Sequence, residues 1–137
     1  MLVSTRGRYG LRSMVDIAIN ATNGPVPLRA IAERQGISES YLEQVFALLR
    51  KAGLVKAVRG SYGGYVLTRP PDNITVGEII HALEGPLVSV NCVTEGKEVS
   101  CDKKDTCHTQ FFWKKLTDQI NEVLSSTTLQ DLVGQDL

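Results

Sequence analysis

The sequence predicts a mainly α-helical fold with a small β-wing, in the element order of a winged helix-turn-helix, followed by a long C-terminal helix. Three observations support this prediction. Apolar residues recur at helical spacing in three successive segments upstream of residue 52. Two short β-prone runs, separated by the glycine-rich stretch 59–64, come next. A long amphipathic segment lies near the C-terminus, with apolar residues at intervals of three and four.

The first expected helix covers residues 5–22, and Asn23, Gly24 and Pro25 stop it, because glycine and proline break helices. Its expected apolar stripe consists of Tyr9, Met14, Val15, Ala18, Ile19 and Ala21.

The second and third helices form the helix-turn-helix. The second covers residues 28–35, and Gly36 follows it at the left-handed turn position, with Ile37 as a buried anchor. Ser38 caps the third helix, which ends near residues 51–53. The residues of this third helix expected to face the core are Tyr41, Leu42, Val45, Phe46 and Leu49.

Residues 54–58 and 65–67 are expected to pair as the two strands of the wing. A further helix covers residues 75–83, and a loop without periodicity runs from 87 to about 106. The expected organisation is a winged helix-turn-helix domain at 1–85, a cysteine-containing loop at 86–108, and a dimerisation helix with the C-terminal tail at 109–137. The apolar repeat of the last long helix is Phe112, Trp113, Leu116, Ile120, Val123 and Leu124.

Charge is distributed unevenly along the chain, although the formal net charge is zero. Residues 1–70 contain ten basic and four acidic side chains, a net of +6, and residues 71–137 contain five and eleven, a net of −6. A basic head on an acidic body is typical of a protein that binds a polyanion such as DNA. The chain has no apolar run long enough for a membrane span and begins without the apolar core of a secretory signal, so we expect a cytoplasmic protein.

The third helix carries side chains suited to the major groove. Glutamine can bond adenine through two hydrogen bonds, and serine hydroxyls can donate or accept. Glu43 faces a polyanion, which is unfavourable unless a cytosine amino group meets it, so it can select against other sequences. An ordinary amphipathic surface helix is the alternative. The candidate DNA-binding residues of this helix are Ser38, Ser40, Tyr41, Glu43, Gln44 and Arg50.

The wing and the first helix supply further candidates. Arg59 is placed to enter a narrow minor groove, and Ser61, Tyr62 and Gly64 belong to a turn that can approach phosphates closely. A plain hairpin turn is the alternative, and no nucleotide-binding loop is implied, because the lysine and threonine of such a loop are missing. At the start of the first helix, the candidate phosphate contacts are Arg6, Arg8 and Tyr9.

All three cysteines, Cys92, Cys101 and Cys107, fall in the expected loop with the spacing Cys-x8-Cys-x5-Cys. In a cytosolic protein such a group indicates metal ligands or redox-active thiols more readily than disulfides. The spacing matches no zinc finger, since there is no Cys-x2-Cys pair. Three thiolates and one weaker ligand would hold a labile 2Fe–2S cluster. A zinc site, a thiol redox switch and three surface cysteines without a role are the alternatives.

These features together resemble the bacterial regulator family of IscR, NsrR and CymR. The resemblance implies a homodimeric winged-helix repressor or activator, with the long C-terminal helix as the dimer arm. It also implies that Ser40, Glu43, Gln44 and Arg59 match the positions that read DNA in IscR-type members. The segments that carry the resemblance are 4–11 (STRGRYGL), 31–32 (IA), 40–44 (SYLEQ), 49–50 (LR), 52–55 (AGLV) and 59–65 (RGSYGGY).

The cysteine loop departs from the IscR pattern. Both gaps are five residues long in that pattern, and a histidine three positions after the third cysteine is the fourth ligand. Here Gln110 occupies that position, and His108 is the candidate fourth ligand instead. A group from the partner subunit, or one of the carboxylates, is the alternative, although Arg8 replaces the acidic ligand that NsrR-type members offer across the dimer. The carboxylates in question are Glu95, Asp102 and Asp105.

The favoured interpretation is a regulator, most simply a repressor, of iron–sulfur cluster biogenesis genes that senses its own cluster and binds a palindromic operator in double-stranded DNA as a homodimer. A nitric-oxide or redox sensor, or a regulator of cysteine metabolism from the same family, is the alternative. An enzyme is not expected, because the sequence offers no nucleophile–base pair, carboxylate pair or phosphate loop. A protein-interaction adaptor is the third class, and it would lack the steep salt dependence of DNA binding.

Overall fold

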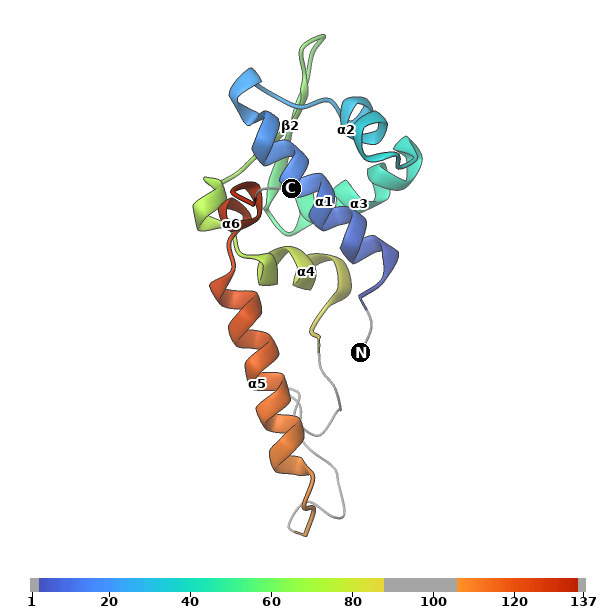
Figure 1. Ribbon diagram of the computed structural model, residues 1–137. Coiled ribbons are helices and arrows are strands. Elements are labelled where there is room, and N and C mark those ends of the chain that lie inside the picture. The colour runs from blue at the N-terminus through green and yellow to red at the C-terminus, as the bar shows by residue number, and fades with distance from the viewer. Residues whose placement is uncertain (1–2, 88–105, 136–137) are drawn as a thin grey trace.

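The computed structural model describes residues 3–87 and 106–135 of the chain. The predicted mainly helical fold with a two-stranded wing is confirmed. Figure 1 shows an elongated molecule in which the wing projects at one end and helix α5 extends toward the other. The elements, in order, are α1 (Thr5–Asn20), η1 (Ala21–Asn23), α2 (Leu28–Gln35), α3 (Glu39–Lys51), β1 (Val55–Val58), β2 (Gly64–Leu67), η2 (Pro71–Asn73), α4 (Val76–Glu84), α5 (Gln110–Ser126) and α6 (Leu129–Val133).

The turn between α2 and α3 is built as the sequence predicts. Gly36 has a φ of 66°, in the left-handed region that glycine adopts without steric cost, and its N–H bonds the carbonyl of Ala32. Ile37 is buried beside it. The Ser38 hydroxyl accepts the N–H of Tyr41 at 3.2 Å, which caps α3. These local signals fix the angle at which α3 leaves α2.

The wing is an antiparallel pair in which Val55 faces Leu67 and Val58 faces Gly64. Its base is fastened to the head by two backbone hydrogen bonds between Val26 and Tyr65, of 2.9 and 2.8 Å. A Cβ on Gly64 would lie 2.4 Å from the backbone of Val26. Gly64 therefore has a packing role at the base of the wing, independent of any contact with DNA.

The buried face of α1 differs from the expected stripe. Met14 and Ile17 are fully buried, whereas Ile19, expected inside, is 56% exposed. The buried positions Gly7, Gly10, Met14 and Ile17 recur at intervals of three and four residues and so share one face of the helix. Ile19 comes two residues after Ile17 and therefore points to a different side of the helix. The expected stripe follows apolar character, whereas the residues of α1 that are buried are those that share one face by the helical period.

The C-terminal segment returns to the head. Leu129, the first residue of α6, is fully buried in the core of the head, and Thr128 bridges to Thr75 at the start of α4. The backbone N–H of Leu129 donates to the carbonyl of Ile74 at 2.8 Å. The C-terminal end of α5 thus lies at the head, and α6 belongs to the head. The expected unit 109–137 therefore contains two structurally different parts.

Candidate DNA interface and cysteine segment

The outward face of α3 presents the polar side chains that the sequence singled out. Ser40, Glu43 and Gln44 are exposed and lie at positions i, i+3 and i+4, so they share one face of the helix. Ser38 at the N-cap and Arg50 in the last turn are also exposed. This face offers hydrogen-bond donors and acceptors at the end of the helix that enters the groove in helix-turn-helix proteins.

Tyr41 belongs to a different environment from its neighbours on α3. It is half-buried, and its ring packs edge-on against Tyr9 of α1, with ring centroids 6.1 Å apart. The guanidinium of Arg12 lies 5.3 Å from the centroid of the Tyr9 ring. The two tyrosines therefore join the recognition helix to α1. The adjacent Arg6 and Arg8 are exposed.

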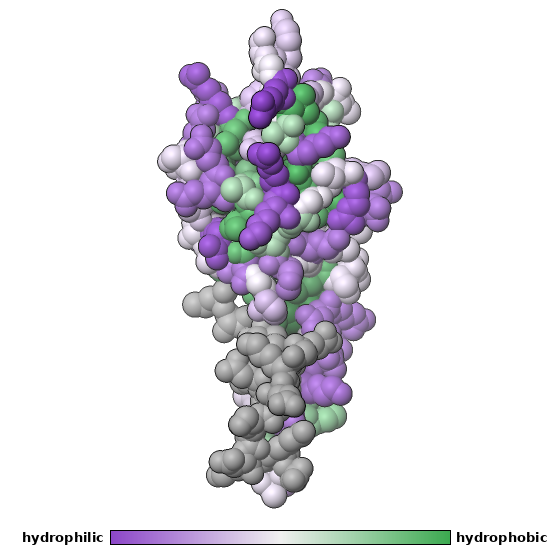
Figure 2. All heavy atoms as spheres, turned by 180° about the vertical axis from the view of Figure 1, so that it is seen from behind, coloured by the Kyte–Doolittle hydropathy of each residue, from purple (hydrophilic) through white to green (hydrophobic). Residues whose placement is uncertain are grey.

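The wing tip carries exposed Arg59, Ser61 and Tyr62. It projects beyond the head both in Figure 1 and in the rear view of Figure 2, where hydrophilic side chains are spread over the head with apolar surface between them. An exposed, projecting hairpin of this kind can reach a neighbouring groove of DNA without moving the head.

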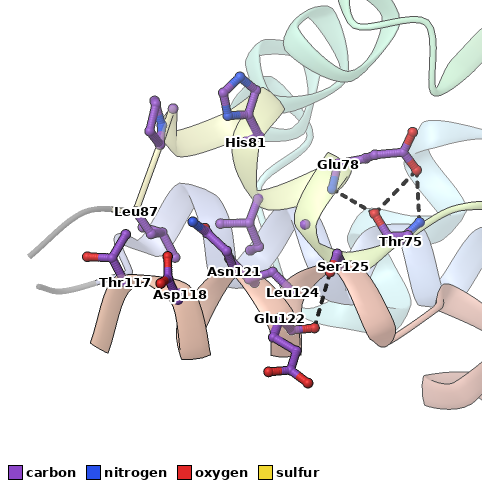
Figure 3. Close-up of a pocket in the computed structure, with 14 residues that line it drawn as sticks. Thr75, Glu78, His81, Leu87, Thr117, Asp118, Asn121, Glu122, Leu124 and Ser125 are labelled. Atoms are coloured by element: carbon purple, nitrogen blue, oxygen red, sulfur yellow. Dashed lines mark hydrogen bonds between the residues drawn. The ribbon is translucent and has the colours of Figure 1, made fainter. Parts of the chain in front are cut away.

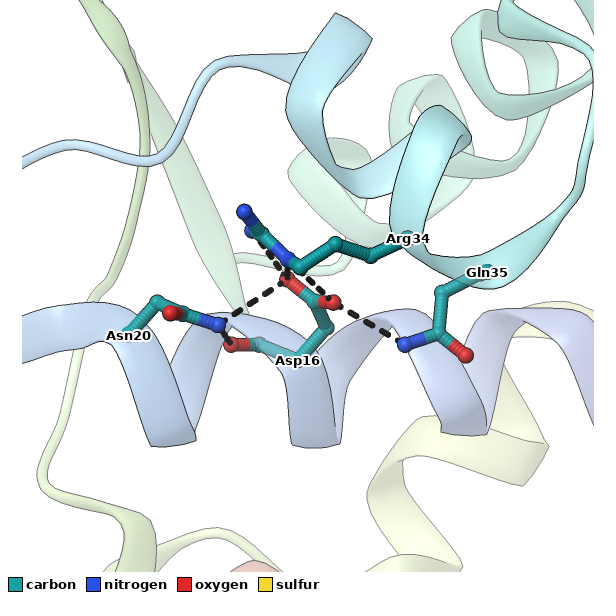
Figure 4. A network of polar contacts seen from close by, with 4 residues as sticks. All are labelled: Asp16, Asn20, Arg34 and Gln35. Atoms are coloured by element: carbon teal, nitrogen blue, oxygen red, sulfur yellow. Dashed lines mark hydrogen bonds and ion pairs between the residues drawn. The ribbon is translucent and has the colours of Figure 1, made fainter.

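A buried carboxylate joins α1 to the helix-turn-helix. Asp16 is nearly fully buried, and Arg34 holds it with three hydrogen bonds, the shortest of 2.6 Å between Nη2 and Oδ1. The side-chain nitrogen of Gln35 donates to Oδ2 at 2.9 Å, and Asn20 completes the group (Figure 4). The hydrogen bond to Asp16 raises the pKa of Arg34, so the guanidinium stays charged.

Sequence reasoning missed this network. Asp16 lies next to Ile17 on the inward side of α1, and an acid in an apolar stripe is the signal that a basic partner from another element must cover it. The sequence does not say which base, because α2 holds both Arg29 and Arg34. In the structure Arg29 pairs instead with Glu33 on the surface.

Helix α4 begins with a capping box that includes an ion pair. The Thr75 hydroxyl accepts the N–H of Glu78, the Glu78 carboxylate accepts the N–H of Thr75, and Arg69 reaches the same carboxylate at 2.7 Å. Burial alone would raise the pKa of Glu78, but the bond from the Thr75 backbone and the hydrogen bond and charge of Arg69 outweigh it. The pKa of Glu78 is therefore lowered below its ordinary value near 4.5.

The variant Glu78→Gln should be less stable than the wild type at neutral pH and equally stable in acid. A lowered folded-state pKa means that the unfolded chain binds more protons, so this contribution is present above pH 4.5 and disappears as the pH falls through the pKa of folded Glu78. Urea unfolding midpoints of the two proteins across this range would measure the difference. A gap that persists unchanged at low pH would contradict the electrostatic origin. The effect is modest, because the carboxylate is partly solvated.

An open groove of about 840 Å³ separates α4 from the middle of α5 (Figure 3). His81 and Thr75 line one side, and Asp118, Asn121 and Ser125 line the other. His81 is exposed.

The described part of the cysteine segment lies at the tip of α5. Cys107 and His108 are exposed, and the sulfur of Cys107 lies 3.2 Å from the Thr109 hydroxyl, just before the helix begins. Cys92 and Cys101 fall outside the described residues. Residues 106–109 lie at the opposite end of the molecule from the wing (Figure 1).

The fold and the exposed polar face of α3 define a winged-helix DNA-binding protein. None of the helices in the described ranges is both long and apolar enough to cross a lipid bilayer.

Comparison with known proteins defines the family. The Rrf2 family, described as "Iron-dependent Transcriptional regulator", matches residues 3–135. The HTH-type transcriptional regulator CymR of Bacillus subtilis is 48% identical over 98% of this chain and 91% of its own length. The regulator IscR of Pectobacterium atrosepticum is 45% identical over 98% of this chain and 80% of its own length. The solved structure of T. potens IscR has a TM-score of 0.77 and 49% identity, covering 97% of this chain and 86% of that one.

This chain is therefore a member of the Rrf2 family of transcriptional regulators, and the predicted resemblance to IscR-type regulators is confirmed. It binds DNA as a transcriptional regulator, and its relatives are named as regulators and not as enzymes. IscR and CymR relatives are similarly close, so the comparison leaves iron–sulfur sensing and cysteine regulation as two possibilities within the family.

Proposed function

We propose that the chain is a homodimeric repressor of iron–sulfur cluster biogenesis genes that senses a 2Fe–2S cluster held by Cys92, Cys101 and Cys107. The observation that carries this proposal is the grouping of all three cysteines of the chain between α4 and α5. Cysteine thiolates are the usual ligands of iron–sulfur clusters, and three of them in one loop supply most of a four-ligand set.

The donor chemistry of the described residues fits such a cluster. Cys107 and His108 are both exposed at the start of α5, so a thiolate and an imidazole are accessible at neighbouring positions. Imidazole can replace thiolate as a ligand of 2Fe–2S centres, as in Rieske centres, where two histidines bind one of the two irons. We assign Cys92, Cys101 and Cys107 as the thiolate ligands and His108 as the fourth. A bound cluster would supply redox-sensitive and labile iron chemistry at this point of the chain.

The cluster proposal predicts a graded loss of iron in variants. Purified without oxygen and reconstituted, the wild type should show the visible absorption and the iron and sulfide content of a cluster. Each of Cys92→Ala, Cys101→Ala and Cys107→Ala should lose most of it, because a thiolate is removed from the metal. His108→Ala should retain an intermediate amount, and His81→Ala should match the wild type, since His81 lies on α4. A wild type that takes up no iron would refute the cluster.

For DNA recognition we propose that Ser40, Glu43 and Gln44 read bases, while Arg59 enters the minor groove. Replacing Gln44 by alanine should weaken operator binding by about 1–3 kcal/mol, the usual value of a bidentate base contact, and relax the preference at one base position in each half-site. Arg8→Ala is the control, because Arg8 is a candidate phosphate contact, and loss of a phosphate contact should weaken binding to all sequences alike. Titration of each protein variant with operators that differ at single base pairs would measure affinity and base preference. If Gln44→Ala weakened binding to all these operators equally, Gln44 would not read a base.

The homodimer is proposed from the exposed apolar face of α5. Phe112, Leu116 and Val123 share one side of this helix by its period, and Phe112 and Val123 are among the exposed large apolar residues of the described chain. A second copy of the same helix would cover them. A two-fold dimer presents two recognition helices, so its operator should be palindromic with half-sites one helical turn apart.

A CymR-type regulator of cysteine metabolism is the second candidate. It is favoured by the 48% identity to CymR of Bacillus subtilis over 91% of that protein. It would need no cluster, and the iron-loading experiment separates the two candidates directly.

A further inference from the structure

The first turn of α1 receives its cap from another helix. Ser4 occupies the N-cap position but caps nothing with its side chain, and the first turn contains no acidic residue. Glu84, the last residue of α4, takes this role. Its Oε1 accepts the N–H of Ser4 at 3.1 Å, the N–H of Gly7 at 2.9 Å and the Ser4 hydroxyl. The negative charge also meets the positive end of the α1 dipole.

Two glycines allow α4 to approach this closely. A Cβ on Gly7 would lie 2.6 Å from Glu84 Oε1, and a Cβ on Gly10 would lie 2.1 Å from Cδ1 of Leu83. Both glycines are buried. The end of α4 is thus packed closely against the first two turns of α1.

The same two turns of α1 carry residues proposed to contact DNA. Arg6 and Arg8 are exposed there, and Tyr9 packs against Tyr41 of the recognition helix. A helix end without a cap frays within its first turn, because its leading N–H groups have no partners. If the cap were lost, Arg6 and Arg8 would no longer be held at a fixed position relative to α3.

We propose that Glu84 is a positioning residue for DNA binding, which holds the first turn of α1 so that Arg6 and Arg8 meet the phosphates. This rests on the DNA-contact role proposed for these two arginines.

The sign of the effect distinguishes this role from simple electrostatics. Glu84 carries a negative charge, so its removal would by charge alone strengthen binding to DNA. A positioning role predicts the opposite. The comparison variant is Glu78→Ala, which removes the same charge and also breaks a helix cap, but at the start of α4 instead of α1.

The experiment measures the affinity of the full chain for a short fluorescent DNA duplex over a range of salt concentrations. Each phosphate contact contributes about 0.9 to the slope of log affinity against log salt, so the double variant Arg6→Ala/Arg8→Ala should lower the slope by about 1.8. Glu84→Ala should lower affinity and reduce the slope toward the same value. Glu84→Gln, which keeps an acceptor oxygen but removes the charge, should keep the wild-type slope and bind at least as tightly as the wild type. Glu78→Ala should leave the slope unchanged.

Adding Glu84→Ala to the double arginine variant should then cause no further loss, because the contacts that it positions are already gone. Thermal unfolding of each variant confirms that it is folded at the assay temperature. An unchanged slope or a higher affinity for Glu84→Ala, beside a reduced slope for the arginine variant, would overturn the role of Glu84 alone. An unchanged slope for the arginine variant would instead refute the proposed phosphate contacts, and the Glu84 role with them.

Discussion

Replacing Arg34 by alanine is expected to lower the free energy of unfolding by about 3 kcal/mol, because it leaves the Asp16 carboxylate buried without its cation. The Asp16 side chain is 2% exposed, and only the amides of Gln35 and Asn20 would remain beside it. The Arg34 side chain is itself 42% exposed, so water can partly replace it, which places the expected loss at the lower end for a broken buried pair.

Arg29→Ala is the matched control on the same helix. Arg29 forms an ion pair with Glu33 at 3.4 Å, but its side chain is 79% exposed, and such pairs contribute about 0.5 kcal/mol or less. Chemical denaturation of the two variants would give the comparison. Equal losses of unfolding free energy in the two variants would show that the buried Asp16 group stabilises the fold no more than an exposed ion pair does. A loss confined to Arg34→Ala would identify the network as the clamp that fixes α2 against α1, and with it the orientation of the reading helix.

The parts of the fold that the sequence predicts correctly depend on neighbours along the chain. The cap at Ser38, the left-handed Gly36 and the glycine turn of the wing act within a few residues, and each is found where its pattern indicates. The exposed residues of α3 follow from the same local periodicity. For this reason the candidate DNA-reading face could be described before the structure, down to its individual side chains.

The parts that the sequence does not predict depend on residues far apart in the chain. Nothing near Ser4 indicates that Glu84 caps α1, and nothing near Asp16 selects Arg34 over Arg29. The burial of Leu129 in the head also requires α5 to end beside α4. These contacts are set by how helices pack, and a single sequence carries no direct record of that packing.

The cysteine segment shows the same division. Its residue types indicate soft-metal chemistry from the sequence alone, whereas its place in the fold is a tertiary property. Residues 106–109 lie at the tip of α5, away from the wing of their own chain (Figure 1). An effect of the cysteines on DNA binding can therefore pass through the end of α4, through α5 and the buried α6, or through a second copy of the chain. The proposed dimer arm, α5, is therefore the element whose role has to be tested.

Introducing aspartate at Val123 is expected to weaken the proposed dimer by on the order of 100-fold or more. Val123 is 63% exposed in the single chain and lies on the apolar side of α5 with Phe112 and Leu116. Burying a valine in an interface contributes about 1.5–3 kcal/mol, and burying an unpaired carboxylate in its place is unfavourable as well, while each 1.4 kcal/mol is a factor of ten. Sedimentation equilibrium would measure the change in the dissociation constant.

The control is Lys114→Asp, which introduces the same side chain at an exposed position on the opposite side of α5 from Phe112, Leu116 and Val123. It should leave the dimer intact. If Val123→Asp yields a folded monomer, its binding to a palindromic operator should become weak and steeply dependent on protein concentration, because each half-site is then bound separately. A Val123→Asp protein that remains dimeric would show that α5 is not the arm, and the exposed Phe112 and Val123 would then require another partner.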